Sequence, residues 1–102
     1  MTRRTKALDI PKKVKDIVWE RDGRRCIVCG SPQAMPNAHY ISRAQSGLGI
    51  EQNVVTLCLH CHNRYDNGGD GDRQKYKELI REYLQGKYPG WTEENLIYKK
   101  EG

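Results

Sequence analysis

Phenylalanine is absent from this sequence of 102 residues, and methionine and tryptophan each occur only twice. Charged residues make up 30% of the chain, so few side chains remain to form an apolar core. A domain of this length buries a modest share of its surface and is only marginally stable by packing alone. We therefore expect one domain, spanning residues 1–102, that depends on an additional cross-link.

Long apolar runs are also absent. No segment approaches the ~20 apolar residues that cross a bilayer, and the basic N-terminal sequence MTRRTKALDIPKK lacks the apolar stretch of a signal peptide. We therefore expect a cytoplasmic protein with no membrane partner. Thiols stay reduced in the cytoplasm, which favours metal binding over disulfide bonds for the four cysteines.

The net charge of +5 is unevenly distributed along the chain. Residues 1–15 contain six basic side chains and one acidic side chain, whereas the remaining 87 residues contain twelve of each. A basic segment of this kind suits a polyanion such as DNA, although a solvated tail has the same composition. We interpret residues 1–9 as a basic, partly disordered arm.

Local patterns predict a mixture of helices and strands. Pro11 suits the first turn of a helix, which is expected to end at the RDG sequence of residues 21–23. A loop with two prolines is expected at 31–38, and residues 72–102 are expected to form a C-terminal helical extension. The other predicted elements are strands at 39–41 and 53–58, a short helix at 59–66, a helix that is capped by Asp72 and ends at Gly86, and a short helix after Thr92.

Two Cys-x-x-Cys motifs, Cys26–Cys29 and Cys58–Cys61, are separated by 28 residues. Two such pairs complete a tetrahedral site of four thiolates, which is typical of structural zinc; a rubredoxin-type iron centre is the alternative. The sequence CLHCH at 58–62 also matches the attachment motif of c-type haem. Haem attachment would leave Cys26 and Cys29 unexplained and requires export, so we expect structural Zn²⁺ and no haem.

All three histidines, His39, His60 and His62, lie between or beside these motifs, although a site of four cysteines needs none of them. The sequences IPKKVKDIVWERDGRRCIVCG, AHYISRAQSGLGIEQNVVTLC and CLHCHNRYD resemble an HNH endonuclease of the ββα-metal (His-Me finger) type. The resemblance covers residues 10–66 and places His39, Asn53 and His62 at the H, N and H of that family. It implies an α+β fold with a small zinc-stapled ββα-metal core and flanking helices.

The resemblance also implies a metal-dependent DNA endonuclease that hydrolyses phosphodiester bonds with Mg²⁺ or Mn²⁺. A neutral imidazole, with a pKa of about 6.5, can accept a proton from water, and this role of general base falls to His39. His62 is expected to bind the divalent cation, which stabilises charge on the phosphate and the leaving oxygen. Asp66, one helical turn further on, is expected to be a second ligand or to orient His62. Asn53 is expected to orient the base through hydrogen bonds of its amide.

The chain departs from the family pattern at Ala38, where many members carry an Asp or His that binds the catalytic metal. The step from His39 to Arg43 keeps the register in which His39 is the base. In the alternative register His39 is itself the metal ligand and Tyr40 is the base, but tyrosine, with a pKa of about 10, is a poor base at neutral pH. Because Mg²⁺ readily retains several waters, an incomplete set of ligands is compatible with activity.

DNA is the partner that the resemblance implies. Four arginines near the cysteine motifs are expected to bind phosphates without reading sequence: Arg24, Arg25, Arg43 and Arg64. We therefore predict low sequence specificity, with nicking of one strand as the simplest outcome. Likeness to small free-standing bacteriophage HNH proteins implies phage genome processing or packaging in the host cytoplasm, with terminase subunits as partners. The alternative function is a non-catalytic zinc-binding module for DNA or protein interaction, and neither interpretation predicts an oligomeric state.

Overall fold

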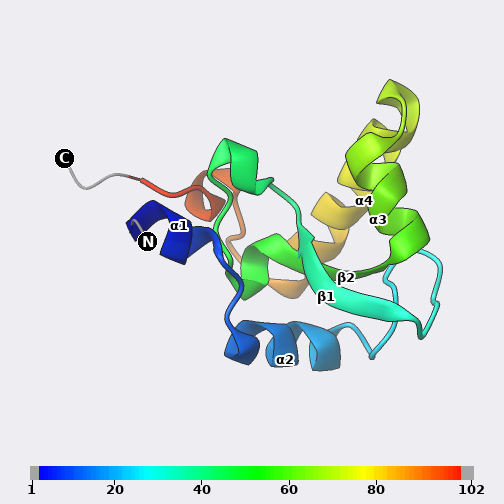
Figure 1. The fold of residues 1–102 in the computed structure, drawn as a ribbon, viewed down its shortest axis with the longest axis horizontal. Helices are drawn as coiled ribbons and strands as arrows, with labels where there is room; N and C mark the ends of the chain where they lie inside the picture. Colours follow the sequence, from blue (N-terminus) through cyan, green and yellow to red (C-terminus); the bar gives the residue numbers. More distant parts are fainter. Residues whose placement is uncertain (1–2, 100–102) are drawn as a thin grey trace.

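A β-hairpin followed directly by a helix forms the centre of the molecule, and further helices surround it (Figure 1). The computed structural model describes residues 3–99. This arrangement confirms the predicted α+β class with a ββα core. The elements are helices α1 (Arg3–Leu8) and α2 (Lys12–Arg21), strands β1 (Ala34–His39) and β2 (Val54–Cys58), helices α3 (Leu59–Asn67) and α4 (Asp70–Lys87), and 3-10 helices at Arg43–Gln45, Glu51–Asn53 and Glu93–Leu96.

The first strand differs from the sequence prediction, which placed a loop at 31–38 and a strand at 39–41. Strand β1 instead ends at His39, which pairs with Val54 of β2. The register shifts between Met35 and Ala38, so Pro36 lies in the irregular part of the strand. A proline has no N–H group to donate to a neighbouring strand, and a bulge is one of the few places where a sheet tolerates it. Pro36 therefore marks a bulge in this strand rather than a loop, whereas Pro32 lies in a bend before the strand.

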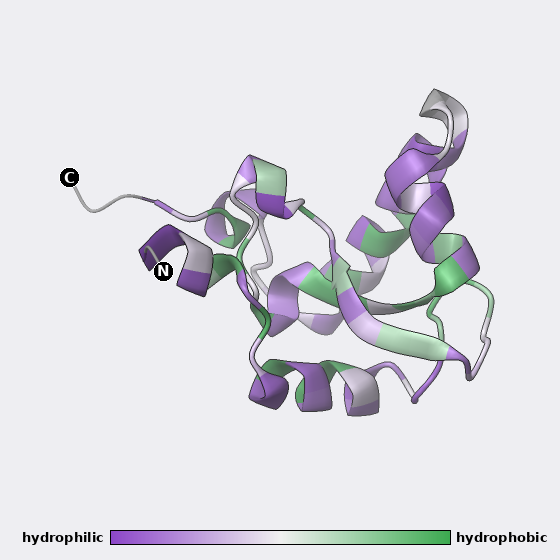
Figure 2. Ribbon diagram, viewed as in Figure 1, coloured by the Kyte–Doolittle hydropathy of each residue, from purple (hydrophilic) through white to green (hydrophobic). Residues whose placement is uncertain are grey.

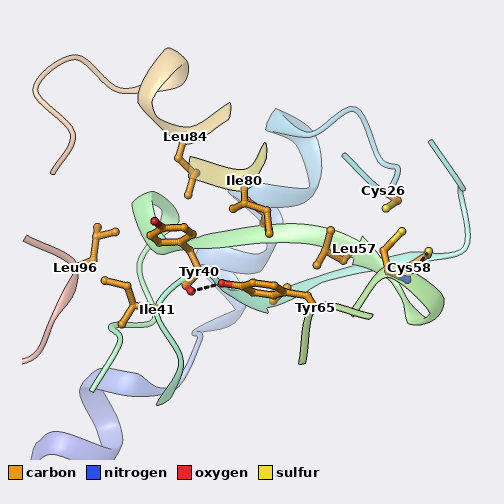
Figure 3. Close-up of a cluster of buried hydrophobic side chains, with 12 residues drawn as sticks. Cys26, Tyr40, Ile41, Leu57, Cys58, Tyr65, Ile80, Leu84 and Leu96 are labelled. Atoms are coloured by element: carbon orange, nitrogen blue, oxygen red, sulfur yellow. Dashed lines mark hydrogen bonds between the residues drawn. The ribbon is translucent and has the colours of Figure 1, made fainter. Parts of the chain in front are cut away.

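The hydrophobic core lies between the hairpin, α3 and α4 (Figure 3). Every residue of β2 is buried, as expected for its run of β-branched and apolar side chains. Helix α4 contributes Ile80 and Leu84, which are fully buried, whereas Leu79 keeps 37% of its surface exposed. The helices turn mainly polar residues outward (Figure 2). The core is thus thin, as the composition predicts.

The boundaries of α4 correct two predictions. The helix begins at Asp70, preceded by Gly69, so Asp72 lies inside its first turn and does not cap it; the Asp72 carboxylate accepts a hydrogen bond from Arg64 instead (2.8 Å). The helix also continues through Gly86 to Lys87. Tertiary contacts outweigh the local propensity of a glycine. Within residues 3–99, no helix combines the length and apolarity needed to cross a membrane.

The N-terminal segment is also more ordered than predicted, because Arg3–Leu8 form helix α1; residues 1–2 of the expected disordered arm lie outside the described residues. Leu8 is buried, with 2% of its surface exposed, and the Gly49 N–H donates to the Ala7 carbonyl (3.0 Å). A Cβ atom at Gly49 would lie 2.0 Å from the Asp9 carbonyl oxygen. The segment therefore packs against the loop before β2, at a point where only a glycine fits.

A buried ion pair at the end of α2 connects this helix to β2 and α4. The side chains of Arg21 and Asp22 are 11% and 0% exposed, and their closest atoms are 2.7 Å apart. Arg21 Nη2 donates to the Val54 carbonyl (2.7 Å), while the Asp22 carboxylate accepts bonds from Thr56 N (2.8 Å) and Tyr83 Oη (2.6 Å). Hydrogen bonds satisfy both charges, as a buried pair requires. In the sequence these two residues predict only the end of a helix.

Candidate active site and metal centre

The four cysteines form one cluster, as the two motifs predict. Their Sγ atoms all lie within 4.8 Å of one another, and all four thiols are free of disulfide bonds. Four sulfurs around one Zn²⁺ at about 2.3 Å would be roughly 3.8 Å apart; Cys29 Sγ and Cys58 Sγ are 3.5 Å apart. The cluster therefore fits one zinc ion, and the cysteines can hold it.

Backbone hydrogen bonds hold the two cysteine motifs in position around the cluster. Cys58 is the last residue of β2, and its Sγ accepts a hydrogen bond from the N–H of Cys61 at the start of α3 (3.4 Å). In the first motif, the N–H of Gly30 donates to the Cys26 carbonyl (3.0 Å), and the N–H of Ile27 donates to the Thr56 carbonyl of β2 (3.1 Å). Burial and the neighbouring thiols raise the pKa of Cys61. A bound cation would offset that cost, because metal binding removes the thiol protons.

His39 ends strand β1 with its ring half-buried. Its Nε2 lies 2.9 Å from the Leu8 carbonyl oxygen. Because a carbonyl can only accept, Nε2 must donate the proton, and in the neutral ring Nδ1 then carries the free lone pair. Burial lowers the pKa of His39, the hydrogen bond to the Leu8 carbonyl opposes this effect, and the positive charge of Arg43 lowers the pKa further. The site therefore holds a neutral imidazole with a defined tautomer at neutral pH.

His62 and Asp66 lie one turn apart on α3. His62 Nε2 is 3.2 Å from Asp66 Oδ2, and the two side chains are 28% and 55% exposed. Asp66 lines the same cavity as His39. Within residues 3–99, however, only the four cysteines bring three or more ligand atoms this close together. His39, His62 and Asp66 are therefore not gathered into a closed metal site, and His62 does not line the cavity that His39 and Asp66 share. A cation held by His62 and Asp66 would take most of its ligands from water or substrate.

Asn53 is completely buried and connects the two ends of the loop that follows His39. Its Oδ1 accepts from Ile41 N (2.8 Å), while its Nδ2 donates to the carbonyls of Ile41 (3.1 Å) and Leu48 (2.8 Å). The Asn53 carbonyl also accepts from the N–H of Tyr40, the residue after His39 (2.7 Å). An amide can donate and accept at once, so this one side chain fixes the backbone on the C-terminal side of His39.

The environment of Tyr40 argues against the alternative register, in which His39 is the metal ligand and Tyr40 is the base. Tyr40 is 3% exposed, its hydroxyl donates to the Glu93 carboxylate, and its ring packs edge-on against Trp91 with 5.6 Å between centroids. Burial raises its pKa, and Glu93 raises it further, so Tyr40 is a poor base. Ala38 is also fully buried in the core. Strand β1 therefore offers the cavity one titratable side chain, His39.

The cavity beside His39 has a volume of about 570 Å³ and is bounded by β1 with its following loop, by α3 and by α4. Asp66 is the acidic residue that lines this cavity, and α4 contributes two basic residues, Arg73 and Lys77. The sequence alone does not distinguish these two residues, because many exposed cations on helices have the same spacing. His60 is exposed and lines a different hollow, next to Arg64.

The four arginines predicted to bind phosphates lie outside this cavity. Arg25 donates to the Gly23 carbonyl through its Nε (3.3 Å). The other three form ion pairs with carboxylates: Arg24 with Glu20 (2.8 Å), Arg43 with Asp9 (2.6 Å) and Arg64 with Asp72 (2.8 Å). Their DNA-binding role stays a prediction, and three of them would have to exchange a carboxylate partner for a phosphate.

Comparisons with known proteins fall on the region that contains the cysteine cluster and the histidines. A family model described as HNH endonuclease matches residues 26–68. Anaredoxin of Nostoc sp. (strain PCC 7120 / SAG 25.82 / UTEX 2576) is 31% identical over 58 residues, which cover 56% of this chain and 76% of that protein. No solved structure matches. The matched family region ends before α4.

Proposed function

Because this chain belongs to the HNH endonuclease family, we propose that it is a metal-dependent DNA endonuclease that hydrolyses phosphodiester bonds. The observation that carries the proposal is the state of His39. Its Nε2 is bound to the Leu8 carbonyl, so that Nδ1 keeps a lone pair, and His39 lines a cavity large enough for a phosphodiester. A base held in one tautomer is the first requirement for activating water.

His39 accepts the proton of the attacking water at Nδ1 and keeps the Nε2 proton on the Leu8 carbonyl. Asn53 holds the backbone that follows His39 and thereby limits rotation of the ring. His62 and Asp66 are the residues that would hold Mg²⁺ or Mn²⁺, since one carboxylate and an open coordination sphere suit these ions. When bound, the ion supplies charge stabilisation for the phosphate and the leaving 3′ oxygen.

Contacts to phosphates carry no sequence information, so we propose low sequence specificity. One cavity with one His39 per chain cuts one strand per encounter, which makes nicking the expected reaction. From the resemblance that the sequence alone suggests to small phage HNH proteins, we further propose a role in phage genome processing beside a terminase.

Cleavage of supercoiled plasmid tests the proposal directly. We expect the zinc-loaded protein to produce open circles before linear DNA in the presence of Mg²⁺ or Mn²⁺, and EDTA to stop the reaction because it removes the catalytic ion. Agarose gel electrophoresis over a time course separates the three forms. A folded, zinc-loaded protein that binds the plasmid but leaves it supercoiled with every metal would instead identify a non-catalytic zinc module.

The cleavage rate is expected to decline in acid with a midpoint below pH 6.5. The folded protein lowers the pKa of His39 from its ordinary value of about 6.5, so the neutral base persists below that pH. The same shift means that the unfolded chain binds the proton more readily, and folding stability decreases as the pH falls from about 6.5 through the lowered pKa. Initial rates between pH 5 and 8 at saturating Mg²⁺ measure the midpoint. A midpoint above 6.5 would exclude His39 as the titrating base.

A further inference from the structure

Helix α4 brings two cations to the cavity that contains His39. Arg73 and Lys77 both line this cavity, together with Gln74 between them. Figure 1 shows the first part of α4 beside α3, the helix that carries Asp66. Residues 73 and 77 lie beyond the matched family region of residues 26–68, so neither the family pattern nor its motifs assign them a role.

The spacing of the two cations matches one face of the helix. Residues four apart lie one above the other on an α-helix, so Arg73 and Lys77 face the cavity together. The Nζ atom of Lys77 lies 5.8 Å from the ring centroid of Tyr40, the residue that follows His39. The ammonium group therefore lies over the ring of the residue that follows the proposed base, and both Lys77 and His39 line the cavity.

Neither cation has an acidic partner among the side chains that the structure describes, since no ion pair of Arg73 or Lys77 occurs there. Three arginines proposed from sequence for this task, at positions 24, 43 and 64, are each bound to a carboxylate. A paired guanidinium must give up its carboxylate before it binds a phosphate, whereas Arg73 and Lys77 have no carboxylate to exchange among the described side chains. Their charge is therefore the more available to an incoming polyanion.

We propose that Arg73 and Lys77 form a phosphate-binding site that holds the backbone of the DNA strand in the His39 cavity. This inference rests on the proposed nuclease function and adds the surface that binds the substrate. The residues proposed for catalysis lie on the hairpin, its loop and α3, while α4 supplies the cations that bind the DNA strand. Because the site contacts only backbone phosphates, it contributes to affinity for every DNA sequence alike.

Salt-dependent binding of a DNA duplex tests the site. The substitutions Arg73→Gln and Lys77→Gln are made in a His39→Ala background, so that binding is measured without cleavage. Fluorescence anisotropy with a labelled duplex gives the dissociation constant at several salt concentrations. Each substitution is expected to weaken binding for unrelated sequences alike and to reduce the slope of log K against log salt by about 1. Arg73→Lys keeps the charge and is expected to keep the slope.

Lys75→Gln is the matched control. Lys75 lies on the same helix between the two proposed residues and is exposed, but it does not line the cavity. Its substitution removes the same charge and is expected to leave the slope nearly unchanged. Equal slopes for the Lys75, Arg73 and Lys77 variants, together with metal-dependent cleavage by the unmodified protein, would overturn the inference and leave the nuclease proposal standing. Absence of both DNA binding and cleavage by the unmodified protein would overturn both.

Discussion

Replacing His39 with alanine is expected to lower the rate of DNA cleavage by about 10²–10⁴-fold, the usual contribution of a general base. The substitution removes the Nδ1 lone pair that accepts the proton of water. It also removes one hydrogen bond, from Nε2 to the Leu8 carbonyl, which contributes only about 1 kcal/mol to stability. The zinc cluster shares no side chain with His39, so the zinc content should not change.

Plasmid cleavage, zinc analysis and thermal unfolding of the same preparation measure these effects together. His60→Ala is the matched control, because His60 is exposed and lines a different hollow; it should cleave at the normal rate. Loss of folding or zinc in His39→Ala would assign His39 a structural role. Unchanged cleavage by this variant would remove His39 from the reaction.

Replacing Cys58 with alanine is expected to unfold most of the protein. Cys58 ends β2, precedes α3 and accepts the N–H of Cys61 through its sulfur. Its loss leaves three thiols that cannot complete a closed tetrahedral site. Binding of structural zinc contributes about 10–16 kcal/mol in small zinc domains, which equals or exceeds the total stability of a typical domain.

Circular dichroism melting and metal analysis of Cys58→Ala test this expectation. Thr56→Val provides a control two residues earlier in the same buried strand, where the Oγ1 atom has no hydrogen-bond partner in the structure; it should retain zinc and fold. Chelation of zinc from the unmodified protein should reproduce the unfolding, and added zinc should reverse it. A melting curve for Cys58→Ala equal to that of the unmodified protein would contradict a structural role for the metal.

Features that depend on neighbouring residues could be predicted from the sequence. Strand β2, the second Cys-x-x-Cys motif and helix α3 adjoin one another in the chain, and the bounds of β2 and α3 lie within one residue of the prediction. The spacing within each Cys-x-x-Cys motif is enough to predict the cysteine cluster. Their patterns are complete over a few residues: ligand spacing for the metal, β-branched residues for the strand. Helix α2 likewise begins after Pro11 and ends before Asp22.

Features that depend on distant partners could not be predicted. Pro36 indicates a loop until one knows that a bulge of β1 accommodates it. The segment that contains helix α1 packs against the loop before β2, where Gly49 leaves room for the Asp9 carbonyl. The basic composition of this segment does not indicate that contact. The acceptor for His39 is a backbone carbonyl, at Leu8, which any residue type would supply. No sequence pattern can therefore reveal the group that sets the tautomer of the base.

The separation between the cysteine cluster and His39 has a consequence for descent within the family. The cysteines form the proposed zinc site, whereas the proposed reaction depends on other side chains, so mutation can alter either property independently. A descendant that lost His39 is therefore expected to keep the cysteine cluster and the fold around it. Family membership therefore indicates a shared fold, whereas the identity of the residue at position 39 indicates whether the proposed activity accompanies that fold.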